Sequence, residues 1–446
     1  MTTLLGLTTT TDLAAHQSQN ARRKVFYSFP NGGAPMTGLL SMADTEASDK
    51  VEWGWYEGRE ENMRIETGRI GSAGPFSAEG NDTAFTTQAL AHGTVYRCVT
   101  EANGTNKLLV GHTIWIKGVP LSGAGTTDLY GVVTEIMTTA KFKFQLEQGA
   151  ATIDNQVGDW AASVSVGVHI IGSAMAEGSH SPSSLYRLPE LSTNYMQIFK
   201  TAWDSTGSSL QEGMKWSDSG HYADKAWQSM RRHANELEAA CLWGMKTNRD
   251  VVDPIDSRTK PRRTTKGIYN FLRDWDTAAS ATTDADPNKR IIDNAAGTIA
   301  QKDYNRYMDR LFEQTNDKNF MKICFCGNGH LTTLTEMWEG RVQVNTEMIG
   351  DEKMKFVINT VTTPAGTVGF HTHPMFSQNP DFKYSGLYLD VNNLAVVPLN
   401  NRNTILQENI QPNNADYIEH QYLTEAGLEM QFPDSHMMIH NLQEVA

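Results

Sequence analysis

Cysteine and long apolar runs are both scarce in this chain, and each scarcity excludes a class of protein. The four cysteines, Cys98, Cys241, Cys324 and Cys326, are too few and too scattered for a disulfide framework. We therefore expect buried thiols in a reducing cytoplasm. No uncharged apolar run reaches about 18 residues, and residues 1–17 lack the basic and apolar regions of a signal peptide. We expect a chain that is neither exported nor membrane-spanning.

Basic residues are also in deficit. The 446 residues include 38 Lys and Arg against 51 Asp and Glu, a formal charge of -13, whereas a protein that grips nucleic acid needs concentrated positive charge. We interpret the short basic clusters as solvated faces or ion pairs in preference to DNA contacts. They are Arg22, Arg23 and Lys24; Arg231 and Arg232; and Lys260, Arg262 and Arg263.

Enzyme motifs are nearly absent. The strongest candidate is His371 and His373, followed by Pro374, which resembles the His-x-His-Pro signature of JAMM-type metalloproteases. In that family a serine and an aspartate ligand follow, but Asp381 and Tyr384 stand at those places, so the third zinc ligand is missing. A zinc-dependent hydrolase that uses the two histidines remains the alternative hypothesis.

Two weaker motifs have simpler interpretations. Cys324 and Cys326 lack a second Cys or Cys/His pair nearby, so buried structural thiols are favoured over half of a zinc or redox site. We expect the side chains of this pair, and of the histidine pair, to point to opposite faces of their strands. Residues 33–38 match half of a phosphate loop, but Leu39 and Leu40 replace its Lys and Ser or Thr. We predict no catalytic, cofactor-binding or metal-binding residues.

The first 172 residues show two contrasting patterns. Residues 1–50 are rich in Thr, Gly, Ala, Ser and Pro and lack apolar periodicity, which indicates an extended arm. Residues 86–172 contain about five short apolar-alternating runs separated by Gly, Asn, Ser and Asp. They predict a small β-barrel or β-sandwich, inserted beside the main body.

A long helix is the clearest single element, and we predict it at 218–246. Its apolar residues step by four and three, which places them on one stripe. Packing on a sheet is favoured over a two-stranded coiled coil. The stripe contains Ala223, Trp227, Met230, Ala234, Leu237, Cys241 and Gly244.

The remaining C-terminal part alternates helices and strands. An amphipathic helix is predicted at 302–314, a strand at 320–326, a further helix soon after, and several strands from 355 onward. This part is therefore α+β.

An Asn-Tyr-x-Gln-Ile-Phe stretch at 194–199 stands before a helix that ends in an apolar residue, Gly and a basic residue, at 242–246. Later segments follow in a fixed order. These are 370–374, 386–391 with Asp390, 396–399, 422–425, 427–429 and finally His436. In these stretches and their order, residues 175–446 resemble the major capsid proteins of tailed double-stranded DNA bacteriophages.

The resemblance implies an α+β, Hong Kong 97-like capsid fold. The implied parts are an N-terminal arm at 1–50, an extended loop at 51–85, the inserted β-rich domain at 86–172, a peripheral domain at 173–264 with spine helix 218–246, an axial domain at 265–400, and a return to the peripheral domain at 401–446.

The implied function is structural. Such a subunit would assemble with copies of itself into hexamers and pentamers of an icosahedral capsid, in the bacterial cytoplasm, and would reside in the virion. A portal and a separate scaffolding protein are expected partners, and a decoration protein is a further candidate. Packaged DNA would be contacted only weakly, and no membrane partner or cofactor is expected. A shell component of encapsulin type is the second alternative.

Overall fold

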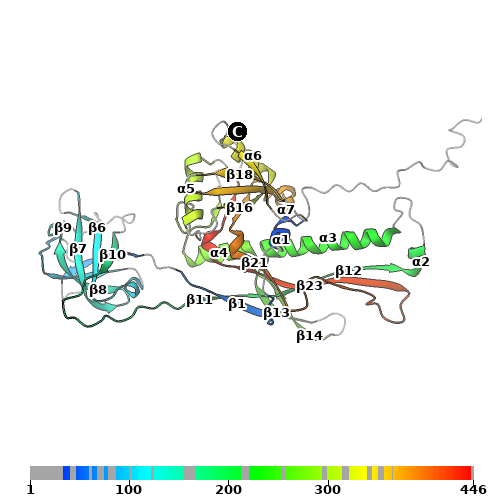
Figure 1. The fold of residues 1–446 in the computed structure, drawn as a ribbon, viewed down its shortest axis with the longest axis horizontal. Helices are drawn as coiled ribbons and strands as arrows, with labels where there is room; N and C mark the ends of the chain where they lie inside the picture. The colour runs from blue at the N-terminus through cyan, green and yellow to red at the C-terminus, as the bar shows by residue number, and fades with distance from the viewer. Residues whose placement is uncertain are drawn as a thin grey trace, which may run out of the picture. The chain divides into compact units, whose positions relative to one another are not determined.

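The computed structural model divides the chain into two compact units, one formed by Met1–Glu57 with Leu191–Ala446 and the other by Gly58–Glu190. Figure 1 shows the fold of the chain. The residues that the structure describes are 34–40, 47–59, 63–67, 75–78, 87–100, 103–121, 125–154, 166–211, 220–252, 257–293, 299–313, 321–338, 344–349, 356–363 and 365–442.

The Gly58–Glu190 unit is built on one antiparallel seven-stranded sheet. Its strand order is β2 (Arg64–Glu66), β10 (Gly167–Ser173), β6 (His112–Pro120), β7 (Thr126–Thr138), β8 (Lys141–Gln148), β5 (Val95–Val99) and β3 (Phe76–Ala78). A separate pair joins β4 (Thr87–Ala89) to β9 (Thr152–Asp154), and η1 spans Gly104–Lys107.

The sheet of this unit curls around an apolar core. A bridge between Thr67 and Thr100 joins the chain beyond β2 to the chain beyond β5. Alternate residues point inward, so that Ile114, Phe142 and Phe144 are fully buried. The predicted β structure is present, and β2 and β3 add strands from before residue 86.

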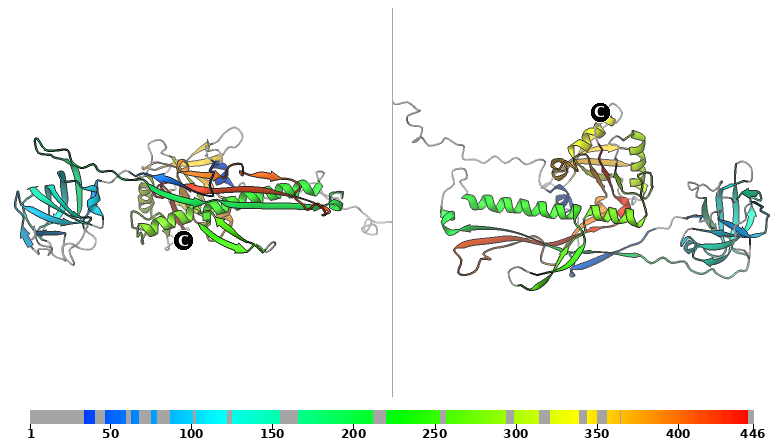
Figure 2. Two further views of the ribbon diagram at one scale, coloured as in Figure 1. Left: turned by 90° about the horizontal axis from the view of Figure 1, so that it is seen from below. Right: turned by 180° about the vertical axis from the view of Figure 1, so that it is seen from behind.

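A long helix lies on a second sheet in the other unit (Figures 1 and 2). In that sheet β12 (Gln197–Thr206) pairs with β23 (Tyr417–Met430), whose other edge pairs with β21 (Leu394–Pro398) and β22 (Ile405–Gln407). The helix, α3, spans Gly220–Trp243. Smaller neighbouring elements are β1 (Glu52–Glu57) with β11 (Glu190–Tyr195), α2 (Gly207–Gln211), and the hairpin of β13 (Thr247–Val252) and β14 (Thr259–Thr264).

The predicted helix is confirmed as α3, and so is its packing on a sheet, but its apolar stripe does not face that sheet. His233 does, with Nδ1 3.0 Å from Thr201 Oγ1 and Nε2 2.7 Å from Thr424 Oγ1, so one imidazole contacts both β12 and β23. On the stripe, Trp227 and Met230 are 40% and 55% exposed. Helical period predicts which residues share a face but not which face the fold buries.

A mixed seven-stranded sheet forms the rest of this unit, which confirms the α+β prediction. Its strand order is β15 (Ile291–Asp293), β24 (Met437–His440), β20 (Gly386–Leu389), β16 (Met321–Cys326), β19 (Thr367–Thr372), β18 (Phe356–Thr362) and β17 (Val344–Ile349). The helices are α4 (Ile268–Ala278), α5 (Gln301–Glu313), α6 (Asn328–Met337) and α7 (Pro374–Gln378), with short turns η2 (Val391–Asn393) and η3 (Pro433–Ser435).

One apolar core joins the helix-on-sheet layer to the mixed sheet. It contains Met36 and Leu40 of α1 (Pro35–Leu40), Cys241 of α3, Phe271 of α4 and Leu428 of β23. All four cysteines are buried, as predicted. The short α1 lies over the C-terminal half of α3, on the side away from β12 and β23 (Figures 1 and 2).

Candidate functional site

A buried carboxylate on α3 joins three distant segments of the chain. Glu238 is 0% exposed. One oxygen accepts a hydrogen bond from Met36 N at 2.9 Å and the other from Thr37 N at 2.7 Å, which fixes the first turn of α1. His373 Nε2 lies 2.7 Å from Oε1. His373 Nδ1 accepts from Met375 N at 3.1 Å, so the imidazole proton is on Nε2 and is donated to Glu238.

This arrangement occupies a histidine of the candidate zinc motif. His371 lies on β19 and His373 just beyond it, and both rings meet Phe325 edge-on, with centroids 6.0 and 5.9 Å away. The expected opposite orientation is therefore wrong. Asp381 is exposed, and among the described residues no cluster of three His, Cys, Asp or Glu side chains could hold a metal ion. His373 acts as a structural donor to Glu238.

Cys324 and Cys326 behave as buried apolar side chains. Both belong to one core cluster on one face of β16, because residues two apart in a strand point the same way. The expectation of opposite faces was wrong here too. Burial raises the pKa of the Cys324 thiol well above its usual value. The structural interpretation of this pair is supported, because buried thiols are inert.

Asn194, which begins the capsid-like stretch, is a fully buried hydrogen-bonding centre. Its amide nitrogen donates to Leu428 O at 2.6 Å and to Thr265 Oγ1 at 3.1 Å. Its amide oxygen accepts from Lys266 N at 2.8 Å. One side chain thus ties β11 to β23 and to the loop before α4.

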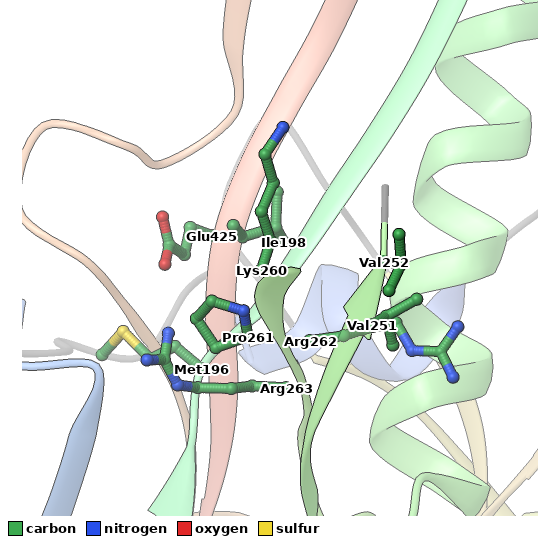
Figure 3. Close-up of a pocket in the computed structure, with 9 residues that line it drawn as sticks. All are labelled: Met196, Ile198, Val251, Val252, Lys260, Pro261, Arg262, Arg263 and Glu425. Carbon is green, nitrogen blue, oxygen red and sulfur yellow. The ribbon is translucent and has the colours of Figure 1, made fainter. Parts of the chain in front are cut away.

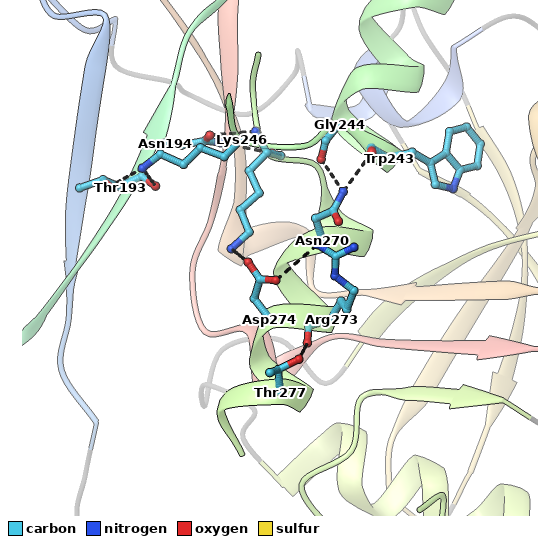
Figure 4. Close-up of polar contacts among 10 residues, drawn as sticks. Thr193, Asn194, Trp243, Gly244, Lys246, Asn270, Arg273, Asp274 and Thr277 are labelled. Atoms are coloured by element: carbon cyan, nitrogen blue, oxygen red, sulfur yellow. Dashed lines mark hydrogen bonds and ion pairs between the residues drawn. The ribbon is translucent and has the colours of Figure 1, made fainter. Parts of the chain in front are cut away.

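Two glycines, Gly244 and Gly267, bring the end of α3 against the start of α4, and Figure 4 shows the first of them. Gly267 N donates to Gly244 O at 2.7 Å, and Asn270 Nδ2 donates to the same oxygen at 2.7 Å. A Cβ on Gly267 would lie 2.6 Å from Gly244 N. Beside this contact, Lys246 Nζ donates to Thr193 O at 2.9 Å. The apolar-Gly-basic ending of the helix therefore joins the end of α3 to the start of α4 and to β11.

A third buried polar centre lies by the mixed sheet. Lys322 is 0% exposed, and its Nζ donates to Leu311 O at 2.7 Å and to Ser435 O at 2.6 Å. Asp390 Oδ2 lies 3.9 Å from Nζ. Burial lowers the pKa of Lys322 to about 8 and raises the pKa of Asp390.

The same buried centre also contains His436, the last histidine of the capsid-like segments. Its Nδ1 accepts from Asp390 N at 3.1 Å. Burial lowers the pKa of His436 to about 3, so the ring is neutral at pH 7. The resemblance to capsid proteins pointed to Asp390 and His436, but it did not point to Lys322. Its only sequence signal is a lysine inside an otherwise apolar strand.

A groove of about 340 Å³ separates β12 from the β13–β14 hairpin (Figure 3). Its floor is partly apolar, with Ile198 and Val252 49% and 60% exposed. Its rim carries one of the basic clusters noted in the sequence. The lining residues are Met196, Ile198, Val251, Val252, Lys260, Pro261, Arg262, Arg263 and Glu425. Such a surface suits an extended segment with apolar and acidic side chains.

The chain also carries an extended segment with exposed apolar side chains. Residues 171–191 are all exposed, and 179–189 form neither helix nor strand. Within them Leu185, Tyr186 and Leu188 are 48%, 80% and 72% exposed. We call 183–191 the strap. Three large apolar side chains within four positions of this segment are therefore left in contact with solvent.

Within the described part of the chain, no helix is long and apolar enough to span a membrane.

A family model described as SU10 major capsid protein matches residues 8–443. No curated protein gives a significant match.

Several solved structures are similar to this chain. One described as Mycobacterium phage Bobi is similar over 97% of this chain and 98% of its own, with 6% identity and a TM-score of 0.43. The capsid asymmetric unit of cyanophage A-1(L) is similar over 62% and 85%, with 10% identity and a TM-score of 0.38. The holo-SrpI encapsulin of Synechococcus elongatus PCC 7942 is similar over 58% and 78%, with 9% identity and a TM-score of 0.37.

Proposed function

This chain belongs to the SU10 major capsid protein family, and from that membership we propose that it builds a Hong Kong 97-like icosahedral shell of hexamers and pentamers around double-stranded DNA. The chain is a shell-forming structural subunit of a phage capsid and not an enzyme. Its place is therefore the virion. Assembly in the bacterial cytoplasm is part of the proposal.

We assign the parts of the Hong Kong 97-like subunit as follows. Residues 1–50 form the N-terminal arm, 51–85 the extended loop, and 86–172 the inserted β-rich domain. The peripheral domain is 173–264, with α3 as the spine helix, and the axial domain is 265–400. Residues 401–446 return to the peripheral domain through β23, while β24 pairs with β20 and β15 of the mixed sheet.

The observation that carries the self-assembly proposal is the strap. Its apolar side chains remain exposed in the subunit, and burying each against a neighbour would contribute roughly 1.5–3 kcal/mol before ordering costs. The groove between β12 and the hairpin is the receiving surface that we propose on the neighbouring subunit. Each subunit would then give one strap and receive another.

The remaining partners are proposed from the charge of the chain and from its family. The net charge of -13 disfavours tight binding to phosphate, so packaged DNA would be held by enclosure with weak contacts. A portal, a separate scaffolding protein and a decoration protein complete the proposed partner set. An encapsulin-type shell would form similar contacts but would lack packaged genomic DNA.

The proposal is tested by changing the strap. Leu185, Tyr186 and Leu188 are replaced together by serine, and a matched control replaces the exposed Ser181, Ser183 and Ser184 by alanine. We expect wild type and control to form rings or closed shells by electron microscopy, with or without coexpressed phage proteins. The strap variant should remain a folded subunit by circular dichroism. A wild type that stays monomeric under all conditions would contradict self-assembly, and a strap variant that assembles normally would contradict the strap contact.

A further inference from the structure

The β13–β14 hairpin carries two arginines side by side. Arg249 of β13 lies directly opposite Arg262 of β14 in the antiparallel register, so both side chains point to the same face of the hairpin. Both are exposed, and neither forms an ion pair with a residue that the structure describes. Like charges that lie directly opposite one another in a sheet are destabilising. The free subunit therefore keeps an unfavourable pair of positive charges on an exposed hairpin.

Two carboxylates have the same arrangement at the far end of the β12–β23 pair. Asp204 of β12 lies directly opposite Glu419 of β23, close to the start of α2. Asp204 is exposed and Glu419 is half-buried. Lys225 Nζ lies 3.8 Å from Asp204 Oδ1, whereas Glu419 has no ion-pair partner in the described part of the chain. This end of the sheet therefore retains negative charge that the subunit does not neutralise.

The arginine pair and the carboxylate pair are complementary in sign and in spacing. Each pair is formed by directly opposite residues of two antiparallel strands, whose Cβ atoms lie about 4.5–5.5 Å apart. Two guanidinium groups at this spacing can each face one of two carboxylates at the same spacing. Arginine suits such a contact because its planar group can bind a carboxylate through two parallel hydrogen bonds.

Within one chain the two pairs cannot meet. The hairpin lies beside the beginning of β12, where Ile198 and Arg262 line the same groove (Figure 3). Asp204 is six positions farther along β12, about 20 Å away at 3.3 Å per residue. Figure 1 likewise shows β14 and α2 at separate places. The surface that matches the hairpin must therefore be on another molecule.

We propose that the Arg249–Arg262 face of the hairpin binds the Asp204–Glu419 end of the sheet on a second copy of this chain. A second copy satisfies both pairs, whereas nucleic acid would satisfy the arginines alone and would meet a chain of net charge -13. The contact joins two different surfaces, so each subunit binds one neighbour through its hairpin and another through its sheet, and such contacts can close into rings. This contact rests on the proposed shell function and adds a charged interaction to the apolar one of the strap.

Charge reversal in the full-length chain tests this contact. The hairpin variant is Arg249→Glu with Arg262→Glu, and the sheet variant is Asp204→Arg with Glu419→Arg. Each should reduce the assembled fraction roughly tenfold, because like charges then meet at the contact. Sedimentation velocity measures this fraction under conditions in which the wild type forms rings or shells. All four substitutions in one chain should restore assembly, and circular dichroism checks that each variant is folded.

A charge-matched control separates this contact from a general effect of net charge. Arg232→Glu with Arg306→Glu changes side chains that are 75% and 70% exposed, and this variant should assemble as the wild type does. Undiminished assembly of the hairpin variant would overturn the contact and leave the proposed shell function in place. Failure of the four substitutions to restore assembly would overturn it as well.

Mixing the two variants tests the contact even if no closed shell forms. At low ionic strength, where surface charges are least screened, neither variant should associate with itself. Their mixture should form dimers and larger species by sedimentation velocity, because each surface then meets its opposite charge. A mixture that stays monomeric would overturn the proposal. If the hairpin variant instead self-associates normally and loses binding to a double-stranded DNA fragment, the arginines serve nucleic acid and the proposal is also overturned.

Discussion

Glu238 and His373 meet inside the protein, with 2.7 Å between Oε1 and Nε2 and neither side chain exposed to solvent. The residues are 135 positions apart, and the same carboxylate receives the first turn of α1 from about 200 positions earlier. Three segments that are far apart in the sequence are thus held together at one carboxylate.

Replacing Glu238 by glutamine should destabilise the subunit by about 1–3 kcal/mol, because the amide nitrogen cannot accept from Thr37 N and leaves a partly buried donor unsatisfied. Urea unfolding of the dissociated subunit measures this loss. Glu190→Gln is the control: it and its partner Arg187 are both exposed, and exposed pairs contribute about 0–1 kcal/mol. Equal stability of the two variants would contradict the anchoring role of Glu238.

Gly267→Ala should lower the free energy of unfolding by about 1–3 kcal/mol, since the added Cβ meets the backbone at the C-terminal end of α3. Gly172→Ala is matched to it in chemistry, and a Cβ there has nothing within 4 Å. Thermal denaturation compares the two. A wild-type melting temperature for Gly267→Ala would show that the two helix ends can move apart at no cost.

Lys322 should make stability depend on alkaline pH. Its pKa is about 8 in the folded chain and about 10.4 in an unfolded one. Between these values the unfolded chain binds a proton that the folded chain does not, so this group's contribution to the free energy of unfolding rises with pH.

The free energy of unfolding of the wild type minus that of Lys322→Met should therefore rise between about pH 8 and pH 10, by no more than about 3 kcal/mol. Both proteins contain the same buried tyrosines, so the contribution of the tyrosines to the pH dependence cancels in this difference. Urea unfolding at several pH values measures the difference, with exposed Lys225→Met as control. A constant difference would mean that Lys322 stays protonated in the fold up to its ordinary pKa.

The thiols should be unreactive in the native subunit. All four are buried, and burial raises the pKa of Cys98, Cys241 and Cys324. We expect negligible labelling by a thiol-specific reagent before denaturation and four equivalents after it. Rapid labelling of the native protein would show that a core segment opens readily.

Local patterns predicted the elements well. The helix at 218–246 and the strand at 320–326 are present as α3 and β16 because period and flanking residues act within one segment. The capsid-like stretch led to Asn194, whose side chain is indeed buried and fully used. The sequence therefore indicated the right region for the central polar contacts.

The environment of those elements could not be predicted in the same way. The stripe of α3 was expected to face the sheet, yet His233 does so because threonines from two strands provide its partners. Lys322 was missed because its acceptors, carbonyls of Leu311 and Ser435, become visible only when three distant segments pack. Such contacts are set by tertiary structure, which residue periodicity does not encode.

The pairing of β12 with β23 also determines when the sheet can form during translation. Gln197 pairs with Ala426, so the ribosome has released the first strand long before it has made the second. At roughly 5–20 residues per second, the wait is on the order of ten seconds or more. Until then α3 has no complete sheet beneath it. A subunit still being translated therefore lacks the groove that Ile198 of β12 and Glu425 of β23 both line. This would delay its association with other nascent chains on the same messenger.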